Sequence, residues 1–128
     1  MVKKSSKFLK RYNYFKYINL LARNWCQVKY SDEIYAIGKI INNGINYVVD
    51  GGTGWACSMA IIVNKPLFVY DQDKKNWYKW SYSINNFTKI ESTPLIKVSS
   101  FAGIGTREIN DDGINAIKNL IINSFNNK

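Results

Sequence analysis

Apolar residues recur at spacings of three and four over two long stretches of the chain, 15–28 and 109–125. That spacing is the period of an amphipathic helix, so the sequence predicts a helix in each stretch, and a further helix over 53–63. We expect each helix to pack its apolar face on the core. The apolar positions are Phe15, Ile18, Leu21, Ala22, Trp25 and Val28 in the first helix, and Ile114, Ile117, Ile121 and Phe125 in the last.

Short apolar runs bounded by turn residues predict the strands. Two further runs, 77–82 and 87–90, alternate apolar and polar residues around Asn85 and Asn86, which predicts a β-hairpin. The order of helices and strands predicts an α/β fold, namely a Rossmann-like, mostly parallel sheet flanked by helices, with a hairpin insertion near 77–90. The single strands are predicted at 33–38, 45–50, 66–71 and 95–103.

The length of 128 residues predicts one domain, over 14–128, after a basic N-terminal tail of residues 1–13. No apolar run is long enough to span a membrane, and no signal peptide is evident, so we expect a cytoplasmic protein. The chain has no histidine, and its two cysteines, Cys26 and Cys57, lack metal-ligand spacing. These absences argue against histidine acid–base chemistry and zinc sites, and we predict no metal and no cofactor.

The net charge of +9 has two interpretations. It is typical of nucleic-acid-binding surfaces, but 15 of the 18 basic residues are lysine in a chain rich in Asn, Ile and Tyr. That bias is typical of an AT-rich genome, which we favour over a nucleic-acid surface. A net positive field nevertheless favours anionic ligands of any kind.

The stretch "VVDGGTGWACSMA" places Gly51, Gly52, Thr53 and Gly54 between a predicted strand and a predicted helix. Glycines let the backbone approach a phosphate closely, and a helix N-terminus adds unpaired N–H donors. The alternative is a plain corner, in which Thr53 or Asp50 caps the helix and no ligand is needed.

A second glycine segment, "SSFAGIGTREI", repeats this arrangement after another predicted strand. Gly103 and Gly105 precede Thr106 and Arg107, and a guanidinium suits phosphate better than an ammonium does. Because ligands of parallel α/β sheets lie at the carboxyl ends of the strands, we expect both segments to face one crevice. The alternative for Arg107 is a surface ion pair with an acid such as Glu108.

Four ordered blocks, "NWCQVKYSDEIYAIG", "VVDGGTGWACSMAI", "KPLFVYDQ" followed by "WYKW", and "FAGIGTREI", together resemble SLOG-type Rossmannoid proteins. That superfamily includes the LOG cytokinin-riboside-monophosphate phosphoribohydrolases and DprA-like and YpsA-like proteins, with many phage and viral members. The resemblance covers about residues 22–125. It implies a nucleotide-derived ligand held by the glycine segments, and a phosphate contact from Arg23.

The chain departs from the LOG motif PGGxGTxxE at three positions. Asp50 replaces the proline, Trp55 the threonine, and Ser58 the catalytic glutamate. We therefore predict a sensor or sequestering module, with a phosphoribohydrolase-like enzyme and a lysine-driven nucleic-acid binder as alternatives. Glu108 is the one candidate general base.

The chain also begins without the first strand–helix unit of fuller relatives. Either an open sheet edge follows, from which we expect a homo-oligomer, or part of the ligand site is missing. One further candidate is an aromatic patch of Trp77, Tyr78 and Trp80, which would either stack a base or pack against the sheet.

Overall fold

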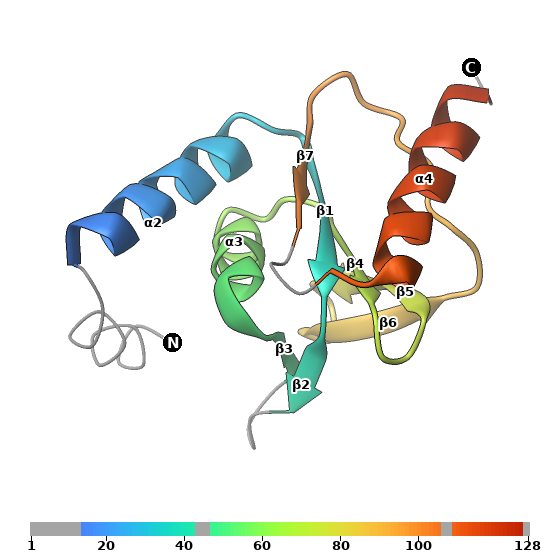
Figure 1. Cartoon of the computed structure of the whole chain (residues 1–128), viewed down its shortest axis with the longest axis horizontal. Coiled ribbons are helices and arrows are strands. Elements are labelled where there is room, and N and C mark those ends of the chain that lie inside the picture. The colour runs from blue at the N-terminus through green and yellow to red at the C-terminus, as the bar shows by residue number, and fades with distance from the viewer. Residues whose placement is uncertain (1–13, 43–46, 106–108, 127–128) are drawn as a thin grey trace.

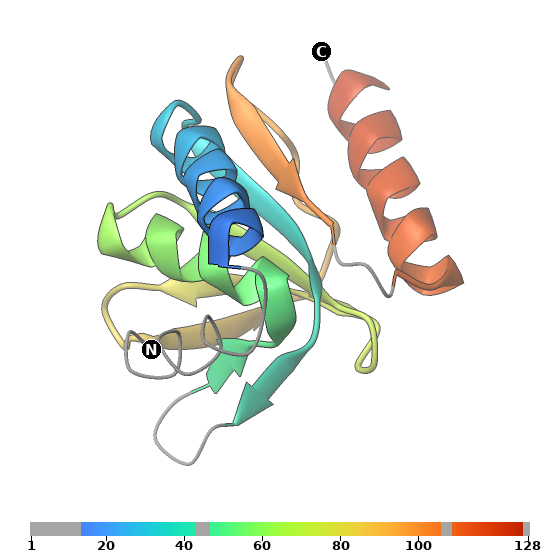
Figure 2. The same cartoon turned by 60° about the vertical axis from the view of Figure 1, so that its left-hand side comes forward.

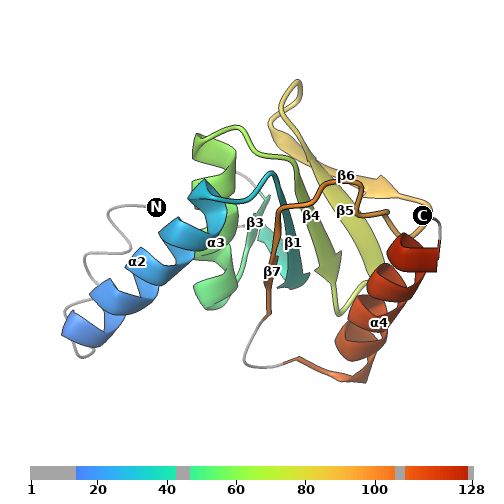
Figure 3. The same ribbon diagram turned by 90° about the horizontal axis from the view of Figure 1, so that it is seen from above.

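The computed structural model describes residues 14–42, 47–105 and 109–126. The described chain forms three layers, with one sheet between two helical layers (Figure 1). Viewed from above, helices α2 and α3 lie on one face of the sheet and helix α4 on the other (Figure 3). The predicted tail, residues 1–13, lies outside the described residues.

The main sheet has five strands in the order β6-β5-β4-β1-β7. Strand β1 is central and pairs in parallel with β4 on one side and β7 on the other. Strand β5 is antiparallel to both β4 and β6, so it alone runs against the others. The strands span Glu33–Gly38 (β1), Leu67–Asp71 (β4), Asn76–Ser81 (β5), Asn86–Ile90 (β6) and Phe101–Ile104 (β7).

The mixed α/β class and the mostly parallel sheet are therefore confirmed, and the arrangement is consistent with a Rossmann-like fold. The predicted hairpin near 77–90 is β5 and β6, and it extends the sheet at its edge. A separate antiparallel pair, β2 (Ile40–Asn42) and β3 (Tyr47–Val49), leaves the end of β1 and leads into α3 (Figure 2). The strand predicted over 95–103 is shorter, because 95–100 carries no strand.

Two hydrophobic clusters fill the spaces between the layers, because successive side chains of a strand point to opposite faces. In β1, Ile34 and Ala36 belong to the cluster under α2 and α3, whereas Tyr35 and Ile37 belong to the cluster under α4. The helices span Tyr14–Lys29 (α2), Gly51–Ile62 (α3) and Asp111–Asn126 (α4).

The same alternation separates the predicted aromatic patch. Trp77 and Trp80 are three positions apart on β5, so their side chains enter opposite clusters, and both are buried. Tyr78 shares the face of Trp80 and is half-buried. The three rings therefore form no common surface, and the interpretation as packing residues is correct for the two tryptophans.

The apolar face predicted for α4 is confirmed only at Ile117, which is half-buried and packs on the cluster beneath α4. Ile114, Ile121 and Phe125 are 40, 41 and 55% exposed, whereas Ala116 and Leu120 are buried against the sheet. A methyl group on Gly113 would overlap the side chain of Gln72, so α4 approaches the sheet through a stripe of small residues.

Helix α2 shows a similar displacement of its predicted face. Trp25 is 39% exposed, so its predicted core packing is wrong, and Ala22 is exposed as well. Val28 is buried as predicted, together with the polar Asn24 one turn earlier. Helix α4 has exposed apolar residues, and β7 is an edge strand of the main sheet. Neither feature tests the predicted self-association, which stays a prediction.

Candidate functional site

The sheet has a topological switch point between the neighbouring strands β1 and β7. The chain that leaves β1 passes through β2 and β3 to α3 on one face, whereas the chain that leaves β7 goes to α4 on the opposite face (Figures 1 and 3). In open α/β sheets, ligands bind in the crevice outside the carboxyl ends of the strands at such a point. The first turns of α3 and α4 both lie at this end of the sheet (Figure 1).

The two glycine segments predicted to face one crevice lie in contact there. The hydroxyl of Thr53, in the first turn of α3, donates a hydrogen bond to the backbone carbonyl of Gly105, which follows β7, at 3.3 Å. Thr53 is buried and Gly105 is exposed, so the contact lies between the core and the surface. Residues 52 positions apart in the sequence thus meet at the switch point.

The first glycine segment is part of a helix rather than a loop. Helix α3 begins at Gly51, two residues before the predicted start, so Gly51–Gly54 form its first turn. A methyl group on Gly54 would overlap the backbone carbonyl of Val49, so this glycine is required for the close approach of α3 to β3. Gly54 therefore has a structural role that needs no ligand, which agrees with that part of the corner interpretation.

The N-terminus of α3 has no side-chain cap. Asp50 occupies the N-cap position in an extended conformation and makes no side-chain hydrogen bond to the first turn, and the hydroxyl of Thr53 is directed to Gly105 instead. The predicted capping by Asp50 or Thr53 is therefore wrong. The carboxylate of Asp50 is still one negative charge beside the positive end of the helix dipole.

The second glycine segment borders a pocket of about 250 Å³ on the α4 side of the sheet. Gly103 and Gly105 both line it, and a methyl group on either glycine would meet no atom within 4 Å. Side chains of Tyr35, Trp77 and Phe101 contribute aromatic walls, and isoleucines of α4 close the opposite side. These glycines leave space open rather than relieve a steric conflict.

A buried polar network holds the carboxyl ends of β1 and β4 in place. The side chain of Asp71 is almost fully buried, and its Oδ2 accepts a hydrogen bond from the N–H of Ile40 at 3.0 Å. Its Oδ1 accepts from the N–H groups of Asp73 and Lys74, each at 2.9 Å. With its lone pairs engaged in this way, Asp71 positions the backbone and is a poor general base.

Gln72 extends this network to α4. Its N–H donates to the carbonyl of Gly38 at 2.9 Å, and its Oε1 accepts from the N–H of Asn110 at 2.8 Å. Asn110 in turn caps α4, because its Oδ1 accepts from the N–H of Gly113. The sequence prediction missed Asp71 and Gln72, although a polar pair at the carboxyl end of a buried strand is a usable signal.

Other predicted site residues lie elsewhere or outside the described chain. Thr106, Arg107 and Glu108 belong to 106–108, which the structure does not describe. Arg23 is exposed on α2, on the helical layer beside α3. Ser58, which the predicted resemblance aligns with the LOG glutamate, is half-buried on α3, one turn beyond the helix start that carries Thr53. The roles predicted for Arg23 and Arg107 stay predictions.

Burial raises the pKa of two groups near the core. The pKa of the Cys57 thiol rises to about 12, because α3 places it in the core where a thiolate would be desolvated. The pKa of Tyr35 is raised well above its ordinary value by burial and by the hydroxyl's hydrogen bond to Glu33. Both groups therefore stay protonated near neutral pH, and neither is an activated nucleophile.

Comparison with family models, curated proteins and solved structures finds no match for this chain. Within the described ranges, no cluster of three or more cysteine, aspartate or glutamate side chains is arranged to hold a metal ion. None of the helices in the described part of the chain is long and apolar enough to cross a membrane.

Proposed function

We propose that this protein binds a nucleotide or nucleotide-derived ligand at the switch-point crevice, as a sensor or sequestering module. The observation that carries the proposal is the hydrogen bond from Thr53 to Gly105, which joins the two glycine segments at the carboxyl ends of β1 and β7. The phosphate of such a ligand would accept hydrogen bonds from the first-turn N–H groups of α3, aided by the guanidinium of Arg107.

Three further features support this proposal. The start of α3 lacks a side-chain cap, so its first N–H groups are not engaged by Asp50 or Thr53. The apolar pocket beside Gly103 and Gly105 has room for a heteroaromatic ring next to the phosphate position. The net charge of +9 raises the local concentration of any anionic ligand.

The acidic residues near the switch point support a binding function rather than a hydrolytic one. Ser58 stands in place of the LOG glutamate, and the hydrogen bonds of Asp71 to three backbone N–H groups occupy its carboxylate. Hydrolysis of a glycosidic bond needs an acid or base within reach of the sugar. The acids left are Glu108, which lies outside the described residues, and Asp50 at the N-cap of α3.

Thermal unfolding with a panel of nucleoside monophosphates, the matching nucleosides and ribose 5-phosphate tests the proposal. A ligand at 100 times its Kd stabilises the fold by about 2.7 kcal/mol, which is a shift of several degrees. We expect the monophosphates to stabilise and the nucleosides to do so far less. Arg107→Ala should abolish the shift, whereas Arg11→Ala, which removes the same charge from the predicted tail, should preserve it.

Two outcomes would contradict the proposal. One is the absence of stabilisation by every phosphorylated compound in the panel. The other is equal loss of binding in Arg107→Ala and Arg11→Ala, together with a steep dependence on salt, which would favour the lysine-driven nucleic-acid binder. Release of free base from a monophosphate would favour the hydrolase instead.

A further inference from the structure

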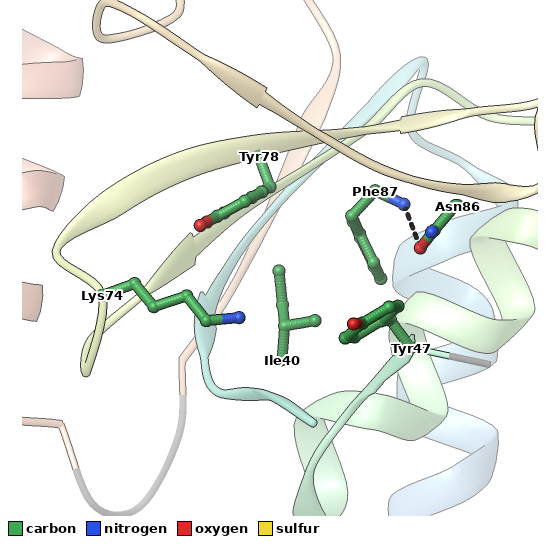
Figure 4. Close-up of a pocket in the computed structure, with 6 residues that line it drawn as sticks. All are labelled: Ile40, Tyr47, Lys74, Tyr78, Asn86 and Phe87. Atoms are coloured by element: carbon green, nitrogen blue, oxygen red, sulfur yellow. Dashed lines mark hydrogen bonds between the residues drawn. The ribbon is translucent and has the colours of Figure 1, made fainter. Parts of the chain in front are cut away.

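A second pocket lies on the α3 side of the sheet, between the small sheet and the β5–β6 hairpin (Figure 4). Its volume is about 160 Å³, and it shares no lining residue with the pocket beside Gly103 and Gly105. Figure 4 shows the side chain of Lys74 extending from the β4–β5 turn toward Ile40, with the ring of Tyr78 above it and the ring of Tyr47 beyond Ile40. The lining residues are Ile40, Tyr47, Lys74, Tyr78, Asn86 and Phe87.

The ammonium of Lys74 is held over two aromatic rings. Its Nζ lies 5.5 Å from the ring centroid of Tyr78 and 5.9 Å from that of Tyr47, both within the range of a cation–π contact. One ammonium at the pocket thus lies within cation–π range of two rings.

The charge of Lys74 is only partly balanced. Among the described residues the nearest carboxylate oxygen is Asp71 Oδ2, which forms an ion pair with Nζ at 3.8 Å, longer than a hydrogen bond. That same oxygen already accepts a hydrogen bond from the N–H of Ile40. The side chain of Lys74 is 48% exposed, so its ammonium retains capacity to donate to an incoming anion.

The walls and size of the pocket define the rest of an occupant. Tyr47 and Phe87 supply aromatic surface and Ile40 an aliphatic one, which suits a flat apolar group. A cavity of about 150 Å³ is known to hold one benzene ring, so this pocket has room for one ring rather than for a whole nucleotide.

We propose that this pocket is a binding site for a small aromatic anion, namely one six-membered ring that carries a single carboxylate or phosphate group. The anionic group pairs with Lys74, and the ring packs between Tyr47, Phe87 and Ile40. The site is independent of the nucleotide proposal, because it depends on different residues on a different part of the molecule.

Calorimetric titration of the whole chain with benzoate, phenyl phosphate and the neutral benzyl alcohol tests the proposal. We expect at least one anion to bind about tenfold more tightly than the alcohol, since a charge-assisted hydrogen bond separates them. Tighter benzoate would identify a carboxylate ligand, and tighter phenyl phosphate a phosphate ester. Failure of both anions to bind, or equal binding of the alcohol, would overturn the proposal.

Matched lysine variants locate the binding. Lys74→Met should weaken binding of the anion about tenfold, because it removes the ammonium and keeps the aliphatic stem. Lys79→Met is the control: Lys79 also lies over an aromatic ring, 5.4 Å from the centroid of Phe68, but outside this pocket. Equal affinities in the two variants would overturn the proposal.

A second variant covers the case in which Lys74→Met unfolds the chain. Tyr47 is 41% exposed, so Tyr47→Leu removes an aromatic wall with little loss of buried surface. It should weaken binding of both anions severalfold while the thermal unfolding temperature stays near that of the wild type. Unchanged affinity in a folded Tyr47→Leu protein would also overturn the proposal.

Discussion

Thr53 and Gly105 are joined by a hydrogen bond of 3.3 Å from the threonine hydroxyl to the glycine carbonyl. This contact connects the first turn of α3, on one face of the sheet, to the end of β7, from which the chain continues to α4 on the other face. It therefore closes the switch point between β1 and β7 and brings the two glycine segments together.

Replacement of Thr53 tests the contact itself. Thr53→Val keeps the shape of the buried side chain but removes the donor, so the unfolding free energy should fall by about 1 kcal/mol, or a few degrees in Tm. Thr53→Ser keeps the hydroxyl and is the control. Nucleotide-dependent stabilisation should shrink in the valine variant and persist in the serine variant. Equal behaviour of the two variants would remove the hydrogen bond from the account.

Removal of the charge at Asp50 should strengthen anion binding. The carboxylate of Asp50 lies at the N-cap of α3 without a cap hydrogen bond, so it competes with a phosphate for the positive end of the helix. Asp50→Asn should raise the affinity for a nucleoside monophosphate severalfold and lower the stability of the free protein by about 0.5 kcal/mol.

Asp32→Asn is the matched control for that charge, because Asp32 is exposed at the opposite end of β1. Calorimetry of both variants separates a local effect from a change in net charge. The same affinity increase in Asp32→Asn as in Asp50→Asn would show that the effect is not specific to the start of α3.

Two glycine-to-alanine substitutions should have opposite effects on stability. Gly54→Ala places a methyl group against the carbonyl of Val49, and should destabilise the fold by several kcal/mol. Gly103→Ala places its methyl in open space, and should be neutral or stabilise by about 0.4–1 kcal/mol through the unfolded state. Chemical denaturation measures both, and a large destabilisation by Gly103→Ala would contradict the open pocket.

The two cysteines should differ in reactivity, and Cys57 should contribute to the pH dependence of stability. Cys26 is exposed and should react quickly with a thiol reagent, whereas Cys57 should react only after unfolding. The folded pKa of Cys57, about 12, exceeds its ordinary value of 9.0. The unfolded chain therefore loses this proton first, so stability should fall as the pH rises from 9 toward 12, by up to about 1.4 kcal/mol per pH unit.

Cys57→Ala supplies the control for the pH dependence. It should lower stability at neutral pH through the loss of packing, but its stability should fall less steeply above pH 9 than that of the wild type. The unfolding free energies of the wild type and of Cys57→Ala are measured by urea unfolding at pH 9 and at pH 10. An equal fall in both proteins would show that Cys57 does not titrate as a buried thiol requires.

Parts of the fold with a strong local signal were predicted well from the sequence. The central strand over 33–38 has its predicted bounds, because a short apolar run ended by glycine has no competing helical period. The hairpin of β5 and β6 also follows from local alternation around a turn, where Asn85 adopts a positive φ of 52°.

The faces of the helices could not be predicted in the same way. Ile114, Ile117 and Ile121 mark an apolar stripe on α4, of which only Ile117 packs on the buried cluster. The fully buried positions are those of the neighbouring stripe, Gly113, Ala116 and Leu120. Hydrophobicity alone does not encode how closely two elements approach, and small residues permit the closer approach. The same limit applies to Gly51–Gly54, whose place in the first turn of α3 depends on the contact of Gly54 with Val49.

The sequence could predict that the two glycine segments lie at the same edge of the sheet, since the carboxyl ends of parallel strands share an edge. The hydrogen bond of Thr53 to Gly105 and the roles of Asp71 and Gln72 were not predictable, because they depend on the order of strands in the sheet. A sequence pattern gives the ends of the strands but not which ends become neighbours.

The central claim is that one anionic ligand contacts both glycine segments at once. Backbone amide chemical shifts, recorded by NMR during titration with a nucleoside monophosphate, test it most directly. The account predicts saturable shifts that follow one binding curve at Gly51–Gly54 and at Gly103–Gly105. Shifts confined to one of these segments, or to neither while other residues respond, would contradict it.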